Sequence, residues 1–313
     1  MADAPTAVTL DHVSVVYGRN HALRDVTALF PPGAVGLLGP NGAGKSTMLK
    51  ALLGFLAPSS GRMEVLGMNV GERPLEVRAR LGYMPETDGH IPGMNAVTFV
   101  AYCGQLAGLP KADAMQRAHE TLFYVGLGEA RYRNLETYST GMKQRIKLAQ
   151  ALVHDPDLVF LDEPTNGMDP KGRDEMLELI RDIAHNKGIN LILSSHLLPD
   201  VEFTCDHVVV LDKGRVATFG PIEELKGPAG RVYEVRVKGD LAPFVAALRD
   251  AGMECRETDE DVMRVFVPGA IEEVGADQRH ICAVAGQVNV QVRHLRTSVP
   301  TLEDVFARAV GEA

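Results

Sequence analysis

The chain has 313 residues, of which 45% are hydrophobic and 23% are charged, and its formal net charge is −9. This length predicts one large domain and one small domain, and the composition is that of an ordinary globular protein. The negative charge argues against a nucleic-acid-binding protein, because such proteins usually carry a basic stripe.

Cysteine placement and hydropathy exclude further classes of protein. The four cysteines include no C-x-x-C pair, so they predict neither a zinc site nor a disulfide framework. The N-terminus contains Asp3 and no basic segment, so we expect no signal peptide. Residues 26–44 and 89–110 lack charged side chains, but Gly and Pro interrupt both windows, so we expect no membrane-spanning helix.

The N-terminal segment predicts an antiparallel sheet edge. Residues 8–17 alternate between apolar and polar side chains, and residues 26–30 continue this pattern after a turn at 18–20. Tyr17 ends the first of these strands. Its ring can stack on an adenine base or pack on the sheet edge, and the strand pattern alone leaves both options open.

The next segment fits the phosphate-loop pattern G-x-x-x-x-G-K-[ST]. It consists of Gly39, Pro40, Asn41, Gly42, Ala43, Gly44, Lys45, Ser46 and Thr47. An apolar run at 35–38 precedes it and a helical pattern at 48–55 follows it, which is the strand–loop–helix context that the motif requires. Glycines turn successive backbone N–H groups toward one oxyanion, and the helix N-terminus adds positive charge. Lys45 would reach the β- and γ-phosphates and Ser46 would ligate Mg²⁺, unless the match is a chance one in a glycine-rich loop.

The middle of the chain predicts a helical insertion. Short strands are expected at 63–66 and 81–85, with a short helix at 75–80 between them. Residues 87–137 then predict an inserted helical lobe, and a break at 138–142 precedes a strong helix. The expected helices lie at 94–109, 112–125 and 143–154.

Two later apolar runs predict strands that are buried on both faces of a parallel sheet. Residues 158–161 are all apolar and end in Asp162 and Glu163, and residues 191–193 end close to His196. The remaining elements of this region are a helix at 174–187 and a strand at 208–211. This alternation predicts an α/β fold with a mostly parallel sheet, whose ligands bind at the carboxyl ends of the strands.

Residues 229–313 predict a smaller α+β domain, whose start lies within the Gly- and Pro-rich segment 227–230. The strand patterns lie at 233–237, 262–267 and 288–292, and the helical patterns lie at 244–251 and 271–285. Their approximate βαββαβ order is typical of ferredoxin-like domains. The chain ends in a helix whose apolar stripe must be buried, and Thr301 and Asp304 fit its capping box.

Asp162 and Glu163 stand where a phosphate-loop ATPase places its acidic residues. Asp162 would hold Mg²⁺, directly or through water, and Glu163 would polarise the attacking water. A surface turn can also carry two carboxylates, but the apolar residues around this pair argue against one. His196 would contact the γ-phosphate, or would be an ordinary buried or capping histidine.

Five segments together resemble an ABC-type ATPase. In the order of that family's Walker A, signature, Walker B, D-loop and H-loop segments, they are Gly39–Thr47, Tyr138–Arg145, Leu161–Thr165, Gly167–Asp169 and His196. Tyr17 matches the family's adenine-stacking aromatic residue. The resemblance covers roughly residues 8–225. It implies a phosphate-loop NTPase core at 1–228, with an antiparallel β edge and a helical subdomain at 87–137, and leaves 229–313 as an accessory domain.

The resemblance also implies a composite site. Two copies of the cassette would pair head to tail with two ATP molecules between them. Each ATP would contact the Walker A segment of one copy and Ser139 and Gly141 of the other. Asp169 of the D-loop belongs to the same nucleotide site. The Ser139 hydroxyl and the following helix N-terminus would face a γ-phosphate.

Two departures from the family pattern matter. The signature reads Ser-Thr-Gly-Met-Lys rather than Ser-Gly-Gly-Gln, but Ser139 and Gly141 are kept, so we expect its function to be kept. Glu86 stands at the Q-loop position, where most of the family has Gln. A carboxylate there can still ligate Mg²⁺ or orient water, although it adds negative charge. Both segments, together with residues 300–306, are similar to the ATPases of ABC-2-type exporters.

We therefore expect an ATPase subunit of a membrane exporter that uses ATP and Mg²⁺ at the cytoplasmic face of the cell membrane. Its helical lobe would dock on a separate transmembrane permease, with Glu86 as the hinge, and the permease rather than this chain would bind the transported substrate. Two copies of this chain would form the ATPase dimer.

Three alternatives stay open at this point. A soluble ABC ATPase that acts on nucleic acid or the ribosome usually has two cassettes or a coiled coil and a basic surface, and this chain shows none of these features. A scaffold that does not hydrolyse nucleotide would be expected to lack Lys45 or Glu163, and both are present. An importer subunit is a minor option.

Overall fold

The structure, a computed structural model, describes residues 6–226, 231–257, 262–268 and 275–311. The chain divides into two compact units, Met1–Ile222 and Glu223–Ala313. The predicted domain boundary at residue 228 lies outside the described residues. Among the helices of the described ranges, none is both long enough and apolar enough to span a membrane.

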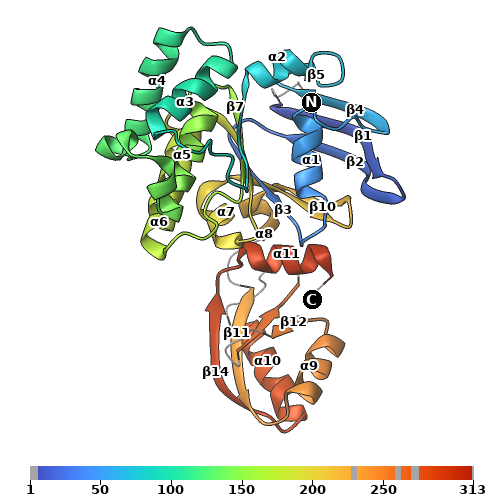
Figure 1. Cartoon of the computed structure of the whole chain (residues 1–313). Helices are drawn as coiled ribbons and strands as arrows, with labels where there is room; N and C mark the ends of the chain where they lie inside the picture. The colour runs from blue at the N-terminus through green and yellow to red at the C-terminus, as the bar shows by residue number, and fades with distance from the viewer. Residues whose placement is uncertain (1–5, 227–230, 258–261, 269–274, 312–313) are drawn as a thin grey trace. The chain divides into compact units, whose positions relative to one another are not determined.

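An antiparallel sheet with the strand order β2-β1-β4-β5 forms one part of the first unit (Figure 1). Its strands are β1 (Val8–Tyr17), β2 (Asn20–Phe30), β4 (Ser60–Val65) and β5 (Met68–Asn69). The sequence pattern predicted β1 correctly but placed the start of its partner at residue 26. β2 begins at Asn20 because its first residues already pair with the end of β1 across the turn.

A second sheet of six strands follows the order β10-β9-β3-β8-β7-β6. The strands are β3 (Ala34–Leu38), β6 (Leu81–Met84), β7 (Leu158–Asp162), β8 (Asn190–Ser194), β9 (His207–Asp212) and β10 (Arg215–Pro221). All neighbours are parallel except β10, which is antiparallel to β9. Every residue of β3 and β7 is buried, as their apolar runs predicted. Asp162 pairs in register with Ser194, so the two strands bring these polar side chains to the same edge.

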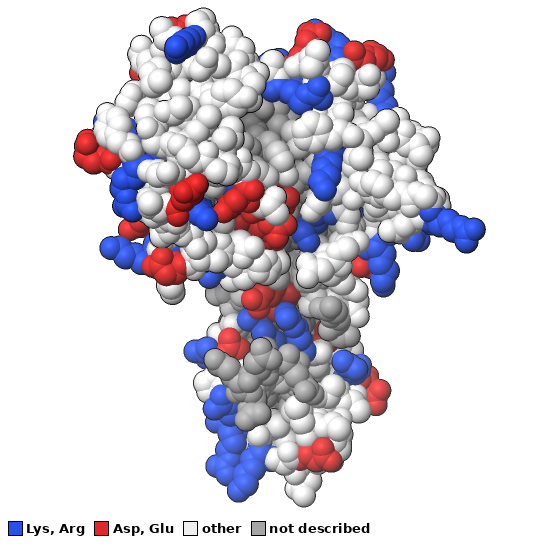
Figure 2. All heavy atoms as spheres, in the orientation of Figure 1, with Lys and Arg blue, Asp and Glu red and all other residues white. Residues whose placement is uncertain are grey.

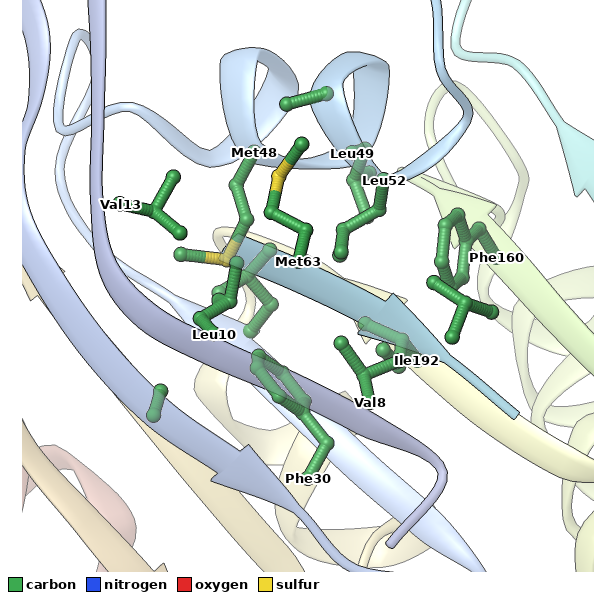
Figure 3. Close-up of a cluster of buried hydrophobic side chains, with 14 of the residues drawn as sticks. Val8, Leu10, Val13, Phe30, Met48, Leu49, Leu52, Met63, Phe160 and Ile192 are labelled. Carbon is green, nitrogen blue, oxygen red and sulfur yellow. The ribbon is translucent and has the colours of Figure 1, made fainter. Parts of the chain in front are cut away.

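Four helices connect these strands, and α1 (Lys45–Leu52) fills the space between the two sheets. The other three are α2 (Pro74–Ala79), α6 (Pro170–His185) and α7 (Leu198–Thr204). Figure 3 shows Met48, Leu49 and Leu52 of α1 directed toward Leu10 and Met63 of the antiparallel sheet. A fully buried side chain of this size contributes about 1.5–3 kcal/mol, so this core fixes the start of α1 firmly.

The helical lobe, residues 87–137, contains α3 (Ala96–Leu106), α4 (Lys111–Tyr124) and the short 3₁₀ helices η1 (Gly128–Tyr132) and η2 (Leu135–Thr137). α3 and α4 pack against each other and against α5, which spans Thr140–Leu152. The prediction that this last helix begins at Lys143 was wrong by one turn. The Ser139 hydroxyl accepts a hydrogen bond from the Met142 backbone N–H at 3.3 Å, which caps the helix ahead of Gly141.

The second unit has the βαββαβ order that the sequence predicted. Its elements are β11 (Val232–Lys238), α9 (Leu241–Asp250), β12 (Glu254–Glu257), β13 (Met263–Phe266), α10 (Ala276–Gln287) and β14 (Gln291–Ser298). The strands form an antiparallel sheet in the order β12-β13-β11-β14. Buried residues of the strands and of α9 and α10 form one core, which includes Val235, Phe244 and Ile281.

Two details of this unit differ from the sequence prediction. The strand expected at 288–292 was wrong in its first half, because α10 continues to Gln287 and Asn289 then adopts a left-handed conformation with φ of 55°. The start of the preceding helix, expected at Ile271, lies outside the described residues. The C-terminal helix α11 spans Leu302–Val310, and the Asp304 carboxylate accepts a hydrogen bond from the Thr301 backbone N–H at 2.9 Å.

Candidate active site

A cavity of about 530 Å³ opens at the carboxyl ends of the parallel strands. It is lined by residues from the phosphate loop, from the β1–β2 turn and from the ends of β7 and β8. The sequence-predicted residues among them are Tyr17, Asn41, Gly42, Ala43, Gly44, Lys45, Ser46, Thr47, Glu86, Asp162 and Glu163. The phosphate loop and the Asp162–Glu163 pair, which are more than a hundred residues apart in the sequence, therefore meet in one pocket.

The phosphate loop can take this shape only because it has glycines at its two ends. Gly39 has φ of 154°, and a Cβ atom there would lie 2.5 Å from the Leu211 carbonyl oxygen. Gly44 has φ of 111°, and a Cβ atom there would lie 2.8 Å from the Ala22 carbonyl oxygen. Any larger residue would strain the backbone and push the loop away from the strand behind it. The loop then leads directly into α1, whose N-terminal N–H groups favour an anion.

Lys45 is folded back over its own loop. Its Nζ donates hydrogen bonds to the carbonyl oxygens of Gly39 at 2.5 Å and Pro40 at 3.3 Å. Burial lowers the pKa of Lys45, and the carboxylates of Glu163 and Asp162 oppose this shift. The ammonium group is thus held at the pocket by carbonyl oxygens, where it can exchange one of these acceptors for a phosphate oxygen.

Two carboxylates face this ammonium group. Burial raises the pKa of Asp162, and the nearby Glu86 carboxylate adds to the shift, whereas Lys45 opposes it. Burial also raises the pKa of Glu163, against the effect of His196. Glu163 has φ of 52°, an uncommon conformation for a residue other than glycine, and such conformations concentrate at functional sites. Its backbone N–H donates to the Ser194 carbonyl at 2.9 Å, which anchors the turn.

His196 does not line the cavity, but it contacts Glu163, which does. Its Nδ1 lies 2.8 Å from Glu163 Oε2, and its ring is half-exposed whereas the Glu163 side chain is only 12% exposed. The contact fixes the direction of the carboxylate. The exposure of the ring excludes the interpretation of His196 as an ordinary buried histidine.

Ser139, Gly141 and Asp169 do not belong to this cavity. Ser139 caps α5, and the Asp169 carboxylate accepts from the Gly172 backbone N–H at 3.5 Å to cap α6. Gly141 lies in the first turn of α5. These three residues are grouped at the N-terminal ends of two helices, in a different part of the same unit.

Sequence reasoning missed several residues of the cavity. Ser194 lines it at the end of β8, and Arg24 and Lys213 add positive charge to its wall. The position of Ser194 after a buried strand was an available signal, but nothing in the sequence around Arg24 or Lys213 indicated a phosphate site. Tyr83 of β6 lies near the acidic residues, and burial together with Asp162 and Glu86 raises its pKa to about 12.

Comparisons with known proteins all point to the ATP-binding proteins of ABC transporters. The protein family described as ABC transporter matches residues 23–166. A linearmycin resistance ATP-binding protein of Bacillus subtilis (strain 168) is 30% identical over 96% of this chain and 97% of its own length. A daunorubicin resistance ATP-binding protein of Streptomyces coeruleorubidus is 32% identical over 99% of this chain and 97% of its own length. A solved ATP-binding subunit of an ABC transporter superposes with a TM-score of 0.64, at 29% identity over 71% of this chain and 92% of that one.

Proposed function

Because the chain belongs to the ATP-binding proteins of ABC transporters, which are ATPases, we propose that it hydrolyses ATP in the cavity described above and drives export through a separate membrane subunit. The observation that carries the catalytic part is the meeting of Lys45, Asp162 and Glu163 at one phosphate loop. A positive group, a metal-binding carboxylate and a general base are the three components that phosphoryl transfer to water requires.

We expect ATP to lie in the cavity with its phosphates at the loop and its base at Tyr17. The phosphates bind the backbone N–H groups of the loop and the Lys45 ammonium group, at the N-terminus of α1. Tyr17 also lines the cavity, at the end of β1, and its side chain is partly exposed, so its ring is available to stack on the adenine. The Arg24 and Lys213 side chains in the wall add positive charge for the triphosphate.

The donor set of the site fits Mg²⁺. Ser46, Asp162 and Glu86 all line the cavity and offer a hydroxyl and carboxylate oxygens, the hard ligands that Mg²⁺ prefers. The described residues contain no cluster of three or more His, Cys, Asp or Glu side chains that would bind a metal without help. This matches Mg²⁺ chemistry, in which one or two carboxylates act together with phosphate oxygens and water. When bound, the ion would neutralise charge on the transferred phosphoryl group.

Glu163 acts on the attacking water as the general base. Its carboxylate is mostly buried and is oriented by the 2.8 Å contact with His196 Nδ1, so it is held in one direction. General base catalysis is worth about 10² to 10⁴ in rate, which is the loss expected when Glu163 can no longer accept a proton.

A second copy of the chain completes the site. Ser139, Gly141 and Asp169 lie at helix N-termini away from the subunit's own cavity, so in a head-to-tail pair they face the ATP of the partner subunit. Helix N-termini attract anions, which supports this arrangement physically. We propose that two identical chains form this pair and that ATP holds them together.

The transport part of the proposal rests on relatives. The linearmycin and daunorubicin proteins are named for resistance, and the resemblance to ABC-2-type exporters agrees with those names. As the family resemblance implies, the translocation path would lie on a separate permease subunit and this chain would act from the cytoplasmic face. The helical lobe, residues 87–137, would dock on that subunit, and the permease would bind the exported substrate. Export is favoured over import because both relatives are named for drug resistance.

The alternative of a soluble ABC ATPase that acts on nucleic acid or the ribosome gains no support from the surface. On the face of the first unit drawn in Figure 2, basic and acidic side chains are interspersed rather than gathered in a basic stripe.

The test combines two substitutions. Glu163→Gln should abolish hydrolysis and leave ATP binding intact, and its mass in solution should double when Mg-ATP is added. A Ser139→Ala change on the same background should prevent this dimer. Glu120→Gln, an exposed carboxylate on α4, is the control and should hydrolyse ATP like the unmodified chain. Hydrolysis that survives Glu163→Gln would refute the assigned base, and ATP binding without a change in mass would refute the homodimer.

A further inference from the structure

Lys147 is a buried cation in the middle of α5. Its side chain is 1% exposed, and it lies among the buried residues Ile146 and Leu148 of the same helix. Lysine is almost never fully buried unless it is paired. Burial lowers the pKa of Lys147, and the Asp88 carboxylate opposes this shift. A buried ammonium group of this kind requires specific acceptors, and their identity points to its role.

The acceptors belong to the segment that follows β6. Lys147 Nζ donates to the Glu86 backbone carbonyl at 2.8 Å and lies 3.7 Å from the Asp88 carboxylate. One helical turn earlier, Lys143 Nζ lies 3.4 Å from the other oxygen of Asp88. Two cations on one face of α5 therefore hold residues 86–88 against the helix.

This contact joins the two halves of the proposed site. The Glu86 side chain lines the ATP cavity, whereas α5 begins at Ser139, which we assign to the partner's ATP. A shift of α5 along its axis would carry the Glu86 backbone with it, because the Lys147 hydrogen bond is short and shielded from water. The ammonium group also places a positive charge close to the extra negative charge that Glu86 introduces.

We propose that Lys147 is a positioning residue for ATP hydrolysis, which acts by holding Glu86 at the γ-phosphate end of the cavity and by linking Glu86 to the helix that begins at Ser139. This inference rests on the proposed ATPase function. It assigns a catalytic consequence to a side chain that does not itself line the ATP cavity.

The experiment is a double-mutant cycle on the full chain, with steady-state ATP hydrolysis as the readout. Lys147→Met keeps the length of the side chain and removes its charge and its hydrogen bond. Glu86→Ala removes the carboxylate but keeps the backbone carbonyl that Lys147 binds. Leu148→Ala, in the adjacent position of α5, is the control for a loss of packing in the same helix. Asp88→Asn weakens the ion pair between Lys147 and Asp88 by changing the exposed partner. It replaces Lys147→Met as the test variant if Lys147→Met does not fold.

We expect Lys147→Met to lower kcat on the order of tenfold, as the loss of an orienting group typically does, with KM for ATP unchanged. On the Glu86→Ala background the same change should lower kcat no further. Asp88→Asn should act in the same direction and more weakly. Leu148→Ala should lower thermal stability, but it should not lower kcat while leaving KM for ATP unchanged.

The outcomes separate the inference from the function. If the unmodified chain hydrolyses ATP and the effects of Lys147→Met and Glu86→Ala multiply, Lys147 does not act through Glu86 and the inference is wrong. The same holds if Lys147→Met, or Asp88→Asn in its place, leaves kcat unchanged. If the unmodified chain hydrolyses no ATP, the proposed function fails and the inference fails with it.

Discussion

Replacing Asp200 with alanine should destabilise the first unit more than any surface change of equal size. Asp200 lies in α7 and is 1% exposed. Its carboxylate accepts from the Thr165 hydroxyl at 2.7 Å and from Arg173 Nε at 2.8 Å, and it also contacts Arg173 Nη2. It thus connects the turn after Glu163 and the helix α6 to the helix that follows His196.

The size of the effect follows from burial. Alanine would leave the buried Thr165 hydroxyl without its acceptor, which costs about 1–3 kcal/mol. Arg173 is 33% exposed, so water would partly replace its lost partner, and we assign this loss about 1–2 kcal/mol. The sum, about 2–5 kcal/mol, overlaps the range of about 3–5 kcal/mol for breaking a buried ion pair.

Urea unfolding at neutral pH measures this loss. The chain has no tryptophan, and Tyr233 is the only one of its seven tyrosines beyond residue 222, so tyrosine fluorescence reports mainly on the first unit. With an m-value of about 3 kcal/mol per molar urea, the midpoint should fall by about 1 M. Asp200→Asn, which keeps one acceptor oxygen, should recover part of the shift.

The matched control is Arg80→Ala. Arg80 donates to Asp157 at 2.6 Å, but both side chains are about half exposed. An exposed pair contributes at most about 1 kcal/mol, so the midpoint should hardly move. If Asp200→Ala lowers the midpoint no more than Arg80→Ala does, the Asp200 carboxylate is not the buried connection described here.

Two further predictions concern the phosphate loop and the cysteines. Gly44→Ala should abolish binding of a fluorescent ATP analogue while the chain stays folded by circular dichroism, because the new Cβ atom would meet the Ala22 carbonyl at 2.8 Å; binding at normal affinity would contradict the loop geometry. A maleimide at neutral pH should label the exposed Cys282 first. Cys205, whose pKa burial raises to about 12, should react only after unfolding. Mass spectrometry identifies which cysteine carries the label. Rapid labelling of Cys205 in the native chain would show that it is accessible.

The local parts of the site could be predicted from the sequence for a physical reason. The phosphate loop is a contiguous segment, and its glycines, lysine and hydroxyl act within nine residues of one another. Asp162 could be found because a strand buried on both faces is apolar throughout, so the first charged residue marks its carboxyl end. In both cases the signal and the structure it encodes lie in the same short stretch.

The remaining contacts could not be predicted, because they join residues far apart in the sequence. Lys147 and the Glu86 carbonyl are separated by 61 residues, and nothing near either one announces the other. A lysine on a helix is normally assigned to the solvent face. The helix start at Thr140 was missed for a local reason instead, because the Ser139 cap overrides the low helix propensity of Gly141.

The division of the site between two places in one chain has a mechanical consequence. Residues that bind the phosphates are fixed to α1 and to the parallel sheet, whereas Ser139 and Asp169 cap α5 and α6. Under the proposed function, the subunit alone would contact ATP from one side only, and the γ-phosphate would lie open to water. Closure would require a second α5 from another copy, so the helix that completes one site would be the helix that Lys147 ties to Glu86 of the other. Under the proposed function, ATP binding, dimer formation and the position of Glu86 are then coupled through α5, and a permease that contacts the lobe beside α5 can sense all three.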